Sequence, residues 1–598
     1  MWQKRYPPLV NHALLILLLS VPFIGPLLNP HWIMVGESTD QILRVIELNR
    51  GIHEGELYPR WFGDLAGGFG NPYFVFYAPL IYYVSAAFHF LGFGILSSLK
   101  LMIFLGVVLS GIGMFLLART FWGNYGGLVS AVAFIYVPYR MVNIYIRGDF
   151  AEAFAMALFP FVLYFFYQLL DQKTWHYWVG AVTSYAALIL THNCSALIFS
   201  GFLVLFIGFF SLRERKLRKL LRGLGGVAWA ITLSAVFWLP ALLEKKWVNI
   251  HRIYSDPALD FHNNFLQLDK LLSPAWNLEG GIGGRDLPFQ IGWPHLLLAF
   301  FSFVYIMQLN SEKSVVRQNT QFFLLCVLLA LFFIHPSSEL MWEKLPLLKY
   351  LQFPWRYLTV LATFVSLLCG GLFVYFSAAS KMNQKAFLTV LLIVIVLATI
   401  QYCHVKGYYV MNEEILTPAF VKKDGGTVSA CNKSGMDTIE DYGEYMPRSV
   451  TRLPSKEVAG KVFSPSGKTK IMNLKLFLDR YEFTASAEDN EEVIVGSFYY
   501  PGWEARVQGK PISLFTDEEG LIHLRIPRGN NQVVVAFEDT WERKLARAIS
   551  LVGVLGFVPI LFMDRKKRFG FAFKLFFDSL RGWARSAHNN ISGLLGRF

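Results

Sequence analysis

Three short motifs carry the side chains with which this sequence could do chemistry, and each adjoins an apolar segment. The first motif follows the apolar segment that ends near Asn29. It contains Asp40 and Arg44, and a basic and aromatic stretch with Arg60 comes after it. A positioned carboxylate can accept a proton, and a guanidinium binds phosphate through several donors. Such groups just outside a membrane indicate a site that handles a polar group at the bilayer surface.

Asp40 is predicted to lie in the first turn of a helix. Ser38 and Gln41 fit a capping box, the helix macrodipole stabilises a carboxylate in that turn, and Arg44 is four residues away and can pair with it. The helix would have an apolar stripe and a polar side facing away from it, formed by Ile42, Leu43 and Ile46 and by Gln41, Arg44 and Glu47. We therefore expect an amphipathic helix lying at the interface. An ordinary solvated helix start would explain the same residues.

The second motif is the segment from Arg147 to Glu152, which lies between two apolar runs. Asp149 and Glu152 are three residues apart, so their carboxylates share one face of a helix. They could bind a cation, orient a sugar hydroxyl or pair with Arg147. A helix-capping turn with a local ion pair accounts for the same spacing.

The third motif runs from Gln352 to Arg356 and begins another apolar segment. An arginine beside aromatic residues at that depth suits a phosphate held at the headgroup level. An interfacial anchor of Trp355 and Arg356 is the alternative. His192, in a short turn between two apolar segments, could donate to a phosphate or be a satisfied turn residue.

The composition places these motifs in a membrane protein. The chain has 598 residues, of which 54% are hydrophobic and 16% charged, and its mean hydropathy is +0.41. About a quarter of the residues of a soluble domain are charged, and a transmembrane helix needs about 20 apolar residues. The sequence therefore predicts a polytopic α-helical membrane protein. We attribute the net charge of +13 to cytoplasmic Lys and Arg clusters, not to nucleic-acid binding.

The positive charges also predict the topology. The strongest basic cluster, Arg213–Arg222, should face the cytoplasm, but it would lie outside if every apolar run before it crossed the membrane. We therefore expect Tyr73–Leu91, which is rich in Tyr and Phe and contains Pro79, to be a juxtamembrane or re-entrant helix. Both termini are then inside. About twelve spans remain, at residues 9–29, 99–118, 125–143, 153–171, 175–191, 194–212, 223–243, 291–308, 321–335, 356–378, 386–403 and 547–563.

Four parts follow from this topology. Residues 1–403 form a transmembrane module with an extracytoplasmic loop at residues 30–98. Residues 404–545 form an extracytoplasmic β-rich domain, because short β-type runs such as Ile471–Phe483 alternate with turn signals such as Gln508-Gly509. Their spacing is typical of an antiparallel sandwich. Residues 546–563 are the last transmembrane helix, and residues 564–598 are a basic amphipathic cytoplasmic tail on the inner leaflet or a disordered tail.

The motifs together resemble the GT-C superfamily of membrane glycosyltransferases. More closely, the chain is similar to bacterial integral membrane proteins described as 6-pyruvoyl-tetrahydropterin synthase-related. The residues on which this resemblance rests are Asp40, Gly55–Trp61, Gly70–Pro72, Phe76–Pro79, Arg147-Gly148 with Glu152, Thr191-His192, Gln352–Arg356 and Tyr499–Trp503. Relatives often have His-Asp and a second His four residues on, where this chain has Thr39-Asp40 and Arg44, so a family role for a histidine there is in doubt.

The resemblance implies an inverting glycosyltransferase that uses a polyprenyl-phosphate-linked sugar donor. Asp40 would be the base or the acceptor-orienting carboxylate, with Asp149 and Glu152 as further catalytic acids. We expect Arg44, Arg60, Arg147, His192 and Arg356 to bind substrate or phosphate. Metal dependence varies within the superfamily, so the participation of a divalent cation, Mg²⁺ or Mn²⁺, stays open.

The predicted acceptor is a lipid, a glycan or a protein on the extracytoplasmic face of a bacterial inner membrane. A lipid or solute transporter is one alternative, although transporters usually show paired broken helices and polar groups at mid-membrane. A non-catalytic subunit of envelope-glycan assembly, whose β-rich domain binds partners, is another.

Overall fold

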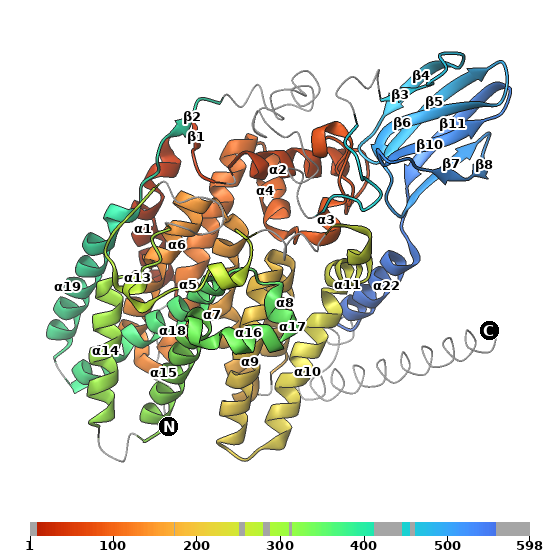
Figure 1. Cartoon of the computed structure of the whole chain (residues 1–598). Helices are drawn as coiled ribbons and strands as arrows, with labels where there is room; N and C mark the ends of the chain where they lie inside the picture. The colour runs from red at the N-terminus through yellow and green to blue at the C-terminus, as the bar shows by residue number, and fades with distance from the viewer. Residues whose placement is uncertain are drawn as a thin grey trace.

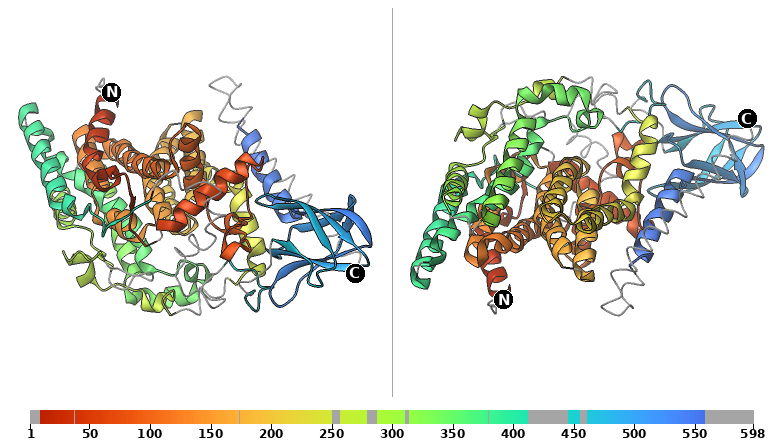
Figure 2. Two further views of the ribbon diagram at one scale, coloured as in Figure 1. Left: turned by 90° about the horizontal axis from the view of Figure 1, so that it is seen from above. Right: turned by 90° about the horizontal axis from the view of Figure 1, so that it is seen from below.

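A computed structural model of the chain describes residues 9–36, 38–172, 174–249, 257–278, 287–309, 314–378, 380–411, 445–454 and 461–557. It has a bundle of helices with a β domain beside one end (Figures 1 and 2). The predicted tail at residues 564–598 lies outside the described residues, as do the residues from 412 to 444.

Each predicted span overlaps a helix, although only residues 547–557 of the last one are described. These helices are α1 (Leu9–Ser20) with η1 (Pro22–Leu28), α5 (Ile95–Ile135), α7 (Phe150–Asp171), α8 (Trp175–Thr191), α9 (Asn193–Leu212), α10 (Leu217–Leu233) with α11 (Ala235–Glu244), α14 (Trp293–Met307), α15 (Ser314–Ile334), α18 (Leu358–Cys369) with η9 (Gly370–Ala378), α19 (Lys381–Thr399) and α22 (Trp541–Leu555). The predicted spans at residues 99–118 and 125–143 share α5, which is broken at Gly123. Among the described residues six helices are long and apolar enough to cross a membrane, or eight if each of two bent pairs forms one span.

The segment Tyr73–Leu91 is helical but broken. It forms α3 (Tyr73–Phe76) and α4 (Leu80–Phe90), with Pro79 directly before the second helix. At 1.5 Å per residue α4 is only about 17 Å long, shorter than the roughly 30 Å of a hydrocarbon core. Its length therefore suits the predicted juxtamembrane position.

The β domain is an antiparallel sandwich. One sheet has the strand order β3-β6-β10-β9 and the other β4-β5-β11-β7-β8. Buried residues of both sheets, among them Val495, Leu524, Phe483 and Val535, share one hydrophobic core. The strands are β3 (Val462–Phe463), β4 (Lys470–Leu476), β5 (Arg480–Ala487), β6 (Glu491–Phe498), β7 (Trp503–Val507), β8 (Lys510–Ile512), β9 (Leu514–Phe515), β10 (Leu521–Ile526) and β11 (Gly529–Phe537).

The run Ile471–Phe483, predicted as one β-type run, is a hairpin of two strands. β4 ends at Leu476 and β5 begins at Arg480, with Leu476 paired to Tyr481. The turn lacks Gly and Pro, so the sequence gives no strong turn signal there. Phe477 N donates to Arg480 O at 2.9 Å and closes the turn.

The loop at residues 30–98 connects the bundle to the β domain. Its first strand, β1 (Trp32–Ile33), pairs with β2 (Tyr408–Tyr409) at the end of the bundle. Its helix α2 (Ser38–His53) contributes to the hydrophobic core of the bundle. Farther along, Trp61 is fully buried in the core of the β domain, where it contacts Trp503 edge to face at 5.4 Å. The loop is therefore part of both cores.

A buried ion pair also joins the bundle to the β domain, next to the rings of Tyr500 and Phe537 that Trp61 contacts. Glu244, at the end of α11, and Arg543, in the first turn of α22, are both inaccessible. Arg543 donates from Nε to Glu244 Oε1 at 2.9 Å and from Nη2 to Glu244 Oε2 at 2.8 Å. Tyr500 Oη also donates to Glu244 Oε2, at 3.0 Å. These bonds hold the start of α22 against the end of α11, at the point where the chain leaves the β domain.

Asp479 gives the contact between the loop and the β domain an expected pH dependence. Burial and the carboxylates of Glu56 and Glu54 raise its pKa to about 6. Because this folded-state pKa lies above the unfolded value of about 3.9, the protonated acid stabilises the fold fully below pH ~4. That stability is lost as the pH rises through about 6.

Asp479→Asn should therefore raise the free energy of unfolding of the β domain at pH 8 by about 1 kcal/mol, discounted because the side chain is half-buried. At pH 4 the change should be close to zero. Thermal unfolding of the purified chain at both pH values measures this difference. Asp489→Asn, at an exposed turn of the same domain, is the matched control and should change stability at neither pH. An equal effect of Asp479→Asn at both pH values would contradict the assignment.

Candidate active site

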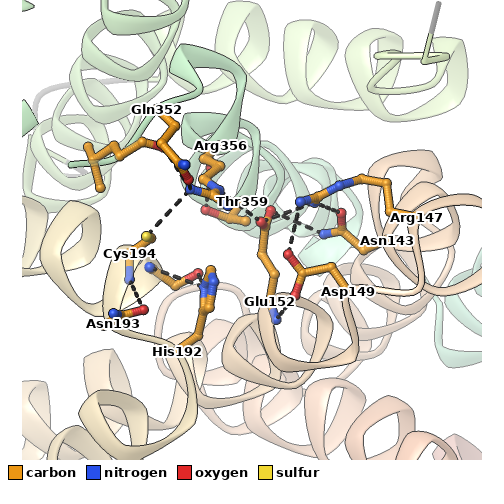
Figure 3. A network of polar contacts seen from close by, with 12 residues as sticks. Asn143, Arg147, Asp149, Glu152, His192, Asn193, Cys194, Gln352, Arg356 and Thr359 are labelled. Atoms are coloured by element: carbon orange, nitrogen blue, oxygen red, sulfur yellow. Dashed lines mark hydrogen bonds and ion pairs between the residues drawn. The ribbon is translucent and has the colours of Figure 1, made fainter. Parts of the chain in front are cut away.

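The turn at Arg147 to Asp149 begins the site. A π-helical turn, η3 (Asn143–Arg147), ends at Gly148, whose φ of +74° is in the left-handed region that glycine adopts without strain. Asp149 follows as the N-cap of α7, and its Oδ1 accepts from Glu152 N at 2.9 Å. The predicted helix-capping turn is therefore present, and it directs Arg147 and both carboxylates to one place (Figure 3).

Glu152 is the centre of this arrangement and is fully buried. Its Oε1 accepts from Tyr139 Oη at 2.5 Å and from Asn143 Nδ2 at 3.2 Å. Its Oε2 lies 3.1 Å from Arg147 Nη1 and 3.6 Å from Arg356 Nε. Four side chains from three elements thus surround one carboxylate.

Arg147 is held by ion pairs and by a ring. Its Nη2 donates to Asp149 Oδ2 at 2.9 Å and its Nη1 to Asn143 Oδ1 at 2.5 Å. The guanidinium lies 4.5 Å from the centre of the Trp355 ring. A cation over an aromatic face is stabilised by the ring quadrupole. The predicted third motif therefore contributes Trp355 as well as Arg356.

Arg356 lies at the edge of the cluster. Its Nη1 donates to Leu351 O at 2.7 Å and to Gln352 Oε1 at 3.2 Å. Its buried Nε makes no hydrogen bond among the described residues and only faces Glu152. The Nε of Arg356 therefore contributes an ion pair, without a hydrogen bond, to the charge around Glu152.

His192 closes the cluster from the turn between α8 and α9. One ligand atom each from Asp149, Glu152 and His192 lies within 4.8 Å of the other two, and all three residues are buried. The His192 ring contacts Ser195 through Nδ1, 2.7 Å from Oγ and 3.3 Å from the backbone N. Because the backbone N–H of Ser195 donates to Nδ1, the neutral ring carries its proton on Nε2, where it offers a donor to an anion. Binding of a cation through Nε2 would need the other tautomer, without that hydrogen bond.

The charges of the cluster keep Asp149 ionised. Burial alone raises the pKa of Asp149, but Arg147, His192 and Arg356 outweigh it and lower this pKa to about 2. Burial lowers the pKa of His192, so the ring is neutral at pH 7. Asp149 is thus a weak base, and its charge serves to hold Arg147.

Asp40 lies in the first turn of α2 and pairs with Arg44, as predicted. Arg44 Nη2 is 3.7 Å from Asp40 Oδ2, and the Asp40 side chain is 46% exposed. This is a loose contact, so the carboxylate is free to accept a proton from a substrate. Among the three predicted catalytic acids, Asp40 alone is accessible.

The polar side of α2 is not at a solvated interface, in contrast to the prediction. Gln41 and Glu47 are inaccessible and Arg44 is 7% exposed. The reason is that α3 and α4 cover this side: the rings of Tyr73 and Tyr77 each lie 4.7 Å from the Arg44 guanidinium.

A hydrogen-bond chain connects Asp40 to the acidic cluster. Arg44 Nη1 donates to Tyr82 Oη at 3.0 Å, Tyr82 Oη donates to Gln41 Oε1 at 2.8 Å, and Gln41 Nε2 donates to Gly148 O at 3.1 Å. The segment before the helix makes a second contact, from Gly36 N to Ile146 O at 2.9 Å. A Cβ at Gly36 would lie 2.8 Å from Arg147 O. The first two motifs therefore adjoin.

Arg60 lies outside the cluster around Glu152. Its Nη2 donates to Val236 O at 3.2 Å, its Nε is 3.8 Å from Asp539 Oδ1, and its guanidinium lies 4.3 Å from the centre of the Tyr58 ring. These partners belong to the junction with the β domain. The structure therefore does not bring Arg60 to the cluster, although it does bring together Arg147, Asp149, Glu152, His192 and Arg356.

Tyr139 and Asn143 were missed by sequence reasoning. They precede Arg147 at intervals of four residues, so a helical face shared with Arg147 was the available signal. Trp355 and Gln352 were noted only as neighbours of Arg356. The tyrosines that enclose Arg44 gave no local signal, because they reach it only after α3 and α4 fold back onto α2.

The chain is similar to a known protein family and to a curated bacterial protein. The model of a family described as "6-pyruvoyl-tetrahydropterin synthase related domain; membrane protein" matches residues 74–406. A curated protein of Lactococcus lactis subsp. cremoris is 23% identical in an alignment of 330 residues that covers 52% of this chain and 49% of that protein. The chain thus spans about half the length of the curated relative that it matches.

Several solved structures are similar to parts of the chain. The Archaeoglobus fulgidus oligosaccharyltransferase in the apo form is 14% identical, with 75% of this chain and 60% of that chain covered and a TM-score of 0.42. ArnT from Cupriavidus metallidurans bound to undecaprenyl phosphate is 15% identical, with 71% and 68% covered and a TM-score of 0.40. The arabinofuranosyltransferase AftD from Mycobacteria is 15% identical, with 66% and 26% covered and a TM-score of 0.43.

Proposed function

The chain belongs to the 6-pyruvoyl-tetrahydropterin synthase related family of membrane proteins, and we propose that it is an inverting glycosyltransferase. It would move a sugar from a polyprenyl-phosphate-linked donor to a lipid, glycan or protein acceptor on the extracytoplasmic face of a bacterial inner membrane. The observation that carries the proposal is the convergence of Arg147 and Arg356 on buried carboxylates, in a turn that the helix of the accessible Asp40 contacts through Gln41.

The two arginines are suited to a departing phosphate. Arg147 and Arg356 both reach Glu152 Oε2, so their guanidiniums are held close together. A guanidinium binds phosphate through several donors at once, and donors fixed where negative charge develops lower the barrier of a transfer reaction. The guanidiniums of Arg147 and Arg356 would donate to the phosphate, and Glu152 and Asp149 keep both arginines in place before it arrives.

Asp40 is suited to the acceptor. Its carboxylate would take the proton of an acceptor hydroxyl, whose oxygen forms a bond to the anomeric carbon of the donor sugar. The bond from that carbon to the phosphate oxygen breaks, and the electron pair leaves with the polyprenyl phosphate. One displacement of this kind inverts the anomeric centre. A base that accepts a proton during such a step contributes a factor of about 10² to 10⁴ to the rate.

We propose that the transfer uses a divalent cation, Mn²⁺ rather than Mg²⁺. Asp149, Glu152 and His192 would hold it, because their ligand atoms already lie within 4.8 Å of one another. An imidazole suits Mn²⁺ better than Mg²⁺, which prefers oxygen ligands and water. Such an ion would neutralise charge on the donor phosphate. EDTA should remove activity, and Mn²⁺ should restore it at a lower concentration than Mg²⁺; full activity in EDTA would refute the cation.

Mass spectrometry of membrane lipids and envelope glycans tests the function whichever sugar is transferred. A strain that lacks the gene should accumulate one polyprenyl-phosphate sugar and lose one glycan modification, and the wild-type gene should reverse both changes. Unchanged lipids and glycans would contradict the proposal. Restoration by an Asp40→Asn gene would instead favour a non-catalytic assembly subunit.

A further inference from the structure

A polar cavity lies at the end of the bundle away from the candidate active site. It has a volume of about 490 Å³ and lies where α7 ends and the turn from α9 leads into α10. Its charged lining consists of Asp171, Glu214, Lys216, Arg218, Lys219 and Arg222. None of these residues belongs to the cluster around Glu152.

The helices place the two sites at opposite headgroup layers. Asp149 caps the start of α7, and Asp171 ends the same helix. The 22 residues of α7 span about 33 Å at 1.5 Å per residue, close to the roughly 30 Å of a hydrocarbon core. The α9–α10 turn lies at the lower edge of the bundle in Figure 1, whereas the loop helices α2 and α4 lie at its upper end. The basic sequence of this turn predicts the cytoplasmic side.

The lining has an excess of positive charge. Four basic residues face two acids, which leaves a net charge of +2. Glu214 accepts from Lys219 at 2.7 Å and from Lys216 at 2.9 Å, and these hydrogen bonds lower its pKa to about 2. Glu214 therefore stays ionised and positions two ammonium groups at the cavity.

The roles of the four cations differ. Arg222 is buried and donates to Leu169 O at 3.0 Å, so it fixes the cavity wall to the end of α7. Lys216 is 62% exposed at its side chain, and Arg218 is exposed as well. These two side chains are accessible to a ligand that approaches from the aqueous side of the headgroup layer.

Apolar side chains flank the same cavity. Leu217 lines it and is 65% exposed, and Leu221, one helical turn farther along α10, is 44% exposed. Residues four apart lie on the same face of a helix. A polar cavity with exposed leucines on its wall and along the adjoining turn of α10 matches a ligand with a charged head and apolar chains, because a soluble phosphate would leave these leucines without a partner.

We propose that this cavity binds the phosphate headgroup of an anionic phospholipid, with the acyl chains along Leu217 and Leu221. Basic pockets between helices on the cytoplasmic side of a membrane are suited to such headgroups. The site is independent of the proposed glycosyl transfer, and it would anchor the α9–α10 turn to the leaflet opposite the candidate active site.

Native mass spectrometry of the purified full chain can test whether the cavity binds an anionic phospholipid. The chain is titrated separately with a diphosphatidylglycerol, a phosphatidylglycerol and a phosphatidylethanolamine. Both anionic lipids should bind more tightly than phosphatidylethanolamine. Lys216→Gln/Arg218→Gln should weaken anionic-lipid binding by about 30-fold, since each basic residue near the surface contributes about a factor of five. Glu214→Gln should strengthen it, because one negative charge is lost.

Two comparisons make the test specific. Lys381→Gln/Lys385→Gln removes two exposed charges at the start of α19, which do not line the cavity, and should leave lipid binding within twofold. Leu217→Ser/Leu221→Ser should weaken binding of the lipid but not of inorganic phosphate. Equal binding of all three lipids, equal loss in both double charge variants, or tighter binding of ADP than of the lipids would overturn the proposal.

Discussion

Replacing Asp40 by Asn should lower kcat by about 10² to 10⁴-fold while the chain still folds and binds its donor. The amide keeps the shape of the side chain but cannot accept the acceptor's proton. The fold should survive because the side chain is 46% exposed and its ion pair with Arg44 is loose, at 3.7 Å. Donor affinity should survive because Arg147 and Arg356, not Asp40, are proposed to hold the phosphate.

Two further variants identify the cause of that loss. Glu56→Gln removes a carboxylate of the same loop, one that accepts from Tyr58 N at 3.3 Å, and should leave kcat unchanged. Arg356→Gln should instead weaken donor binding, so that KM rises. If Asp40→Asn raised KM as Arg356→Gln does and left kcat unchanged, Asp40 would be a binding residue and not the base.

Replacing Arg543 by Met should lower the free energy of unfolding by about 3–5 kcal/mol. The substitution leaves Glu244 buried, although Tyr500 Oη and Thr540 Oγ1 still donate to it at 3.0 and 3.2 Å. An uncompensated buried charge is the reason for the large cost. Thermal unfolding, or protease accessibility of the β domain, measures it.

The double variant Glu244→Leu/Arg543→Met separates the ion pair from packing. Removing both charges at once should cost much less than the single substitution, because no buried charge remains. Arg506→Met breaks an exposed pair with Glu504, 3.9 Å apart, and should change stability by less than about 1 kcal/mol. Equal losses in the single and double variants would show that the packing of Arg543, and not its charge, stabilises the junction.

The spacing of residues along the sequence predicted the contacts between side chains that lie within one helical turn of each other. It predicted the pairing of Asp40 with Arg44 and the shared position of Asp149 and Glu152, because residues three or four apart share a helix face. Hydropathy predicted the long apolar helices of the bundle, and turn residues predicted most strands of the sandwich. The resemblance to the family is confirmed by the match over residues 74–406.

Contacts between distant segments could not be predicted in this way. Nothing near Arg356 in the sequence indicates that its Nε faces Glu152, and nothing near Arg60 indicates that it belongs to the junction beside Asp539. The buried polar side of α2 depends on α3 and α4 folding back, which brings tyrosine rings over Arg44. The number of spans and the side of the membrane on which Asp40 lies remain predictions from charge and segment count.

The most direct test of glycosyl transfer is an assay with the purified chain in lipid nanodiscs. The substrate is the polyprenyl-phosphate sugar that accumulates in the strain lacking the gene, together with the glycan, lipid or protein that loses its modification. Wild-type protein should release one polyprenyl phosphate for each sugar transferred, with the anomeric configuration inverted, and Asp40→Asn should transfer the sugar about 10² to 10⁴-fold more slowly. Transfer by Asp40→Asn at the wild-type rate, or consumption of the donor with retention of configuration, would contradict the proposed mechanism.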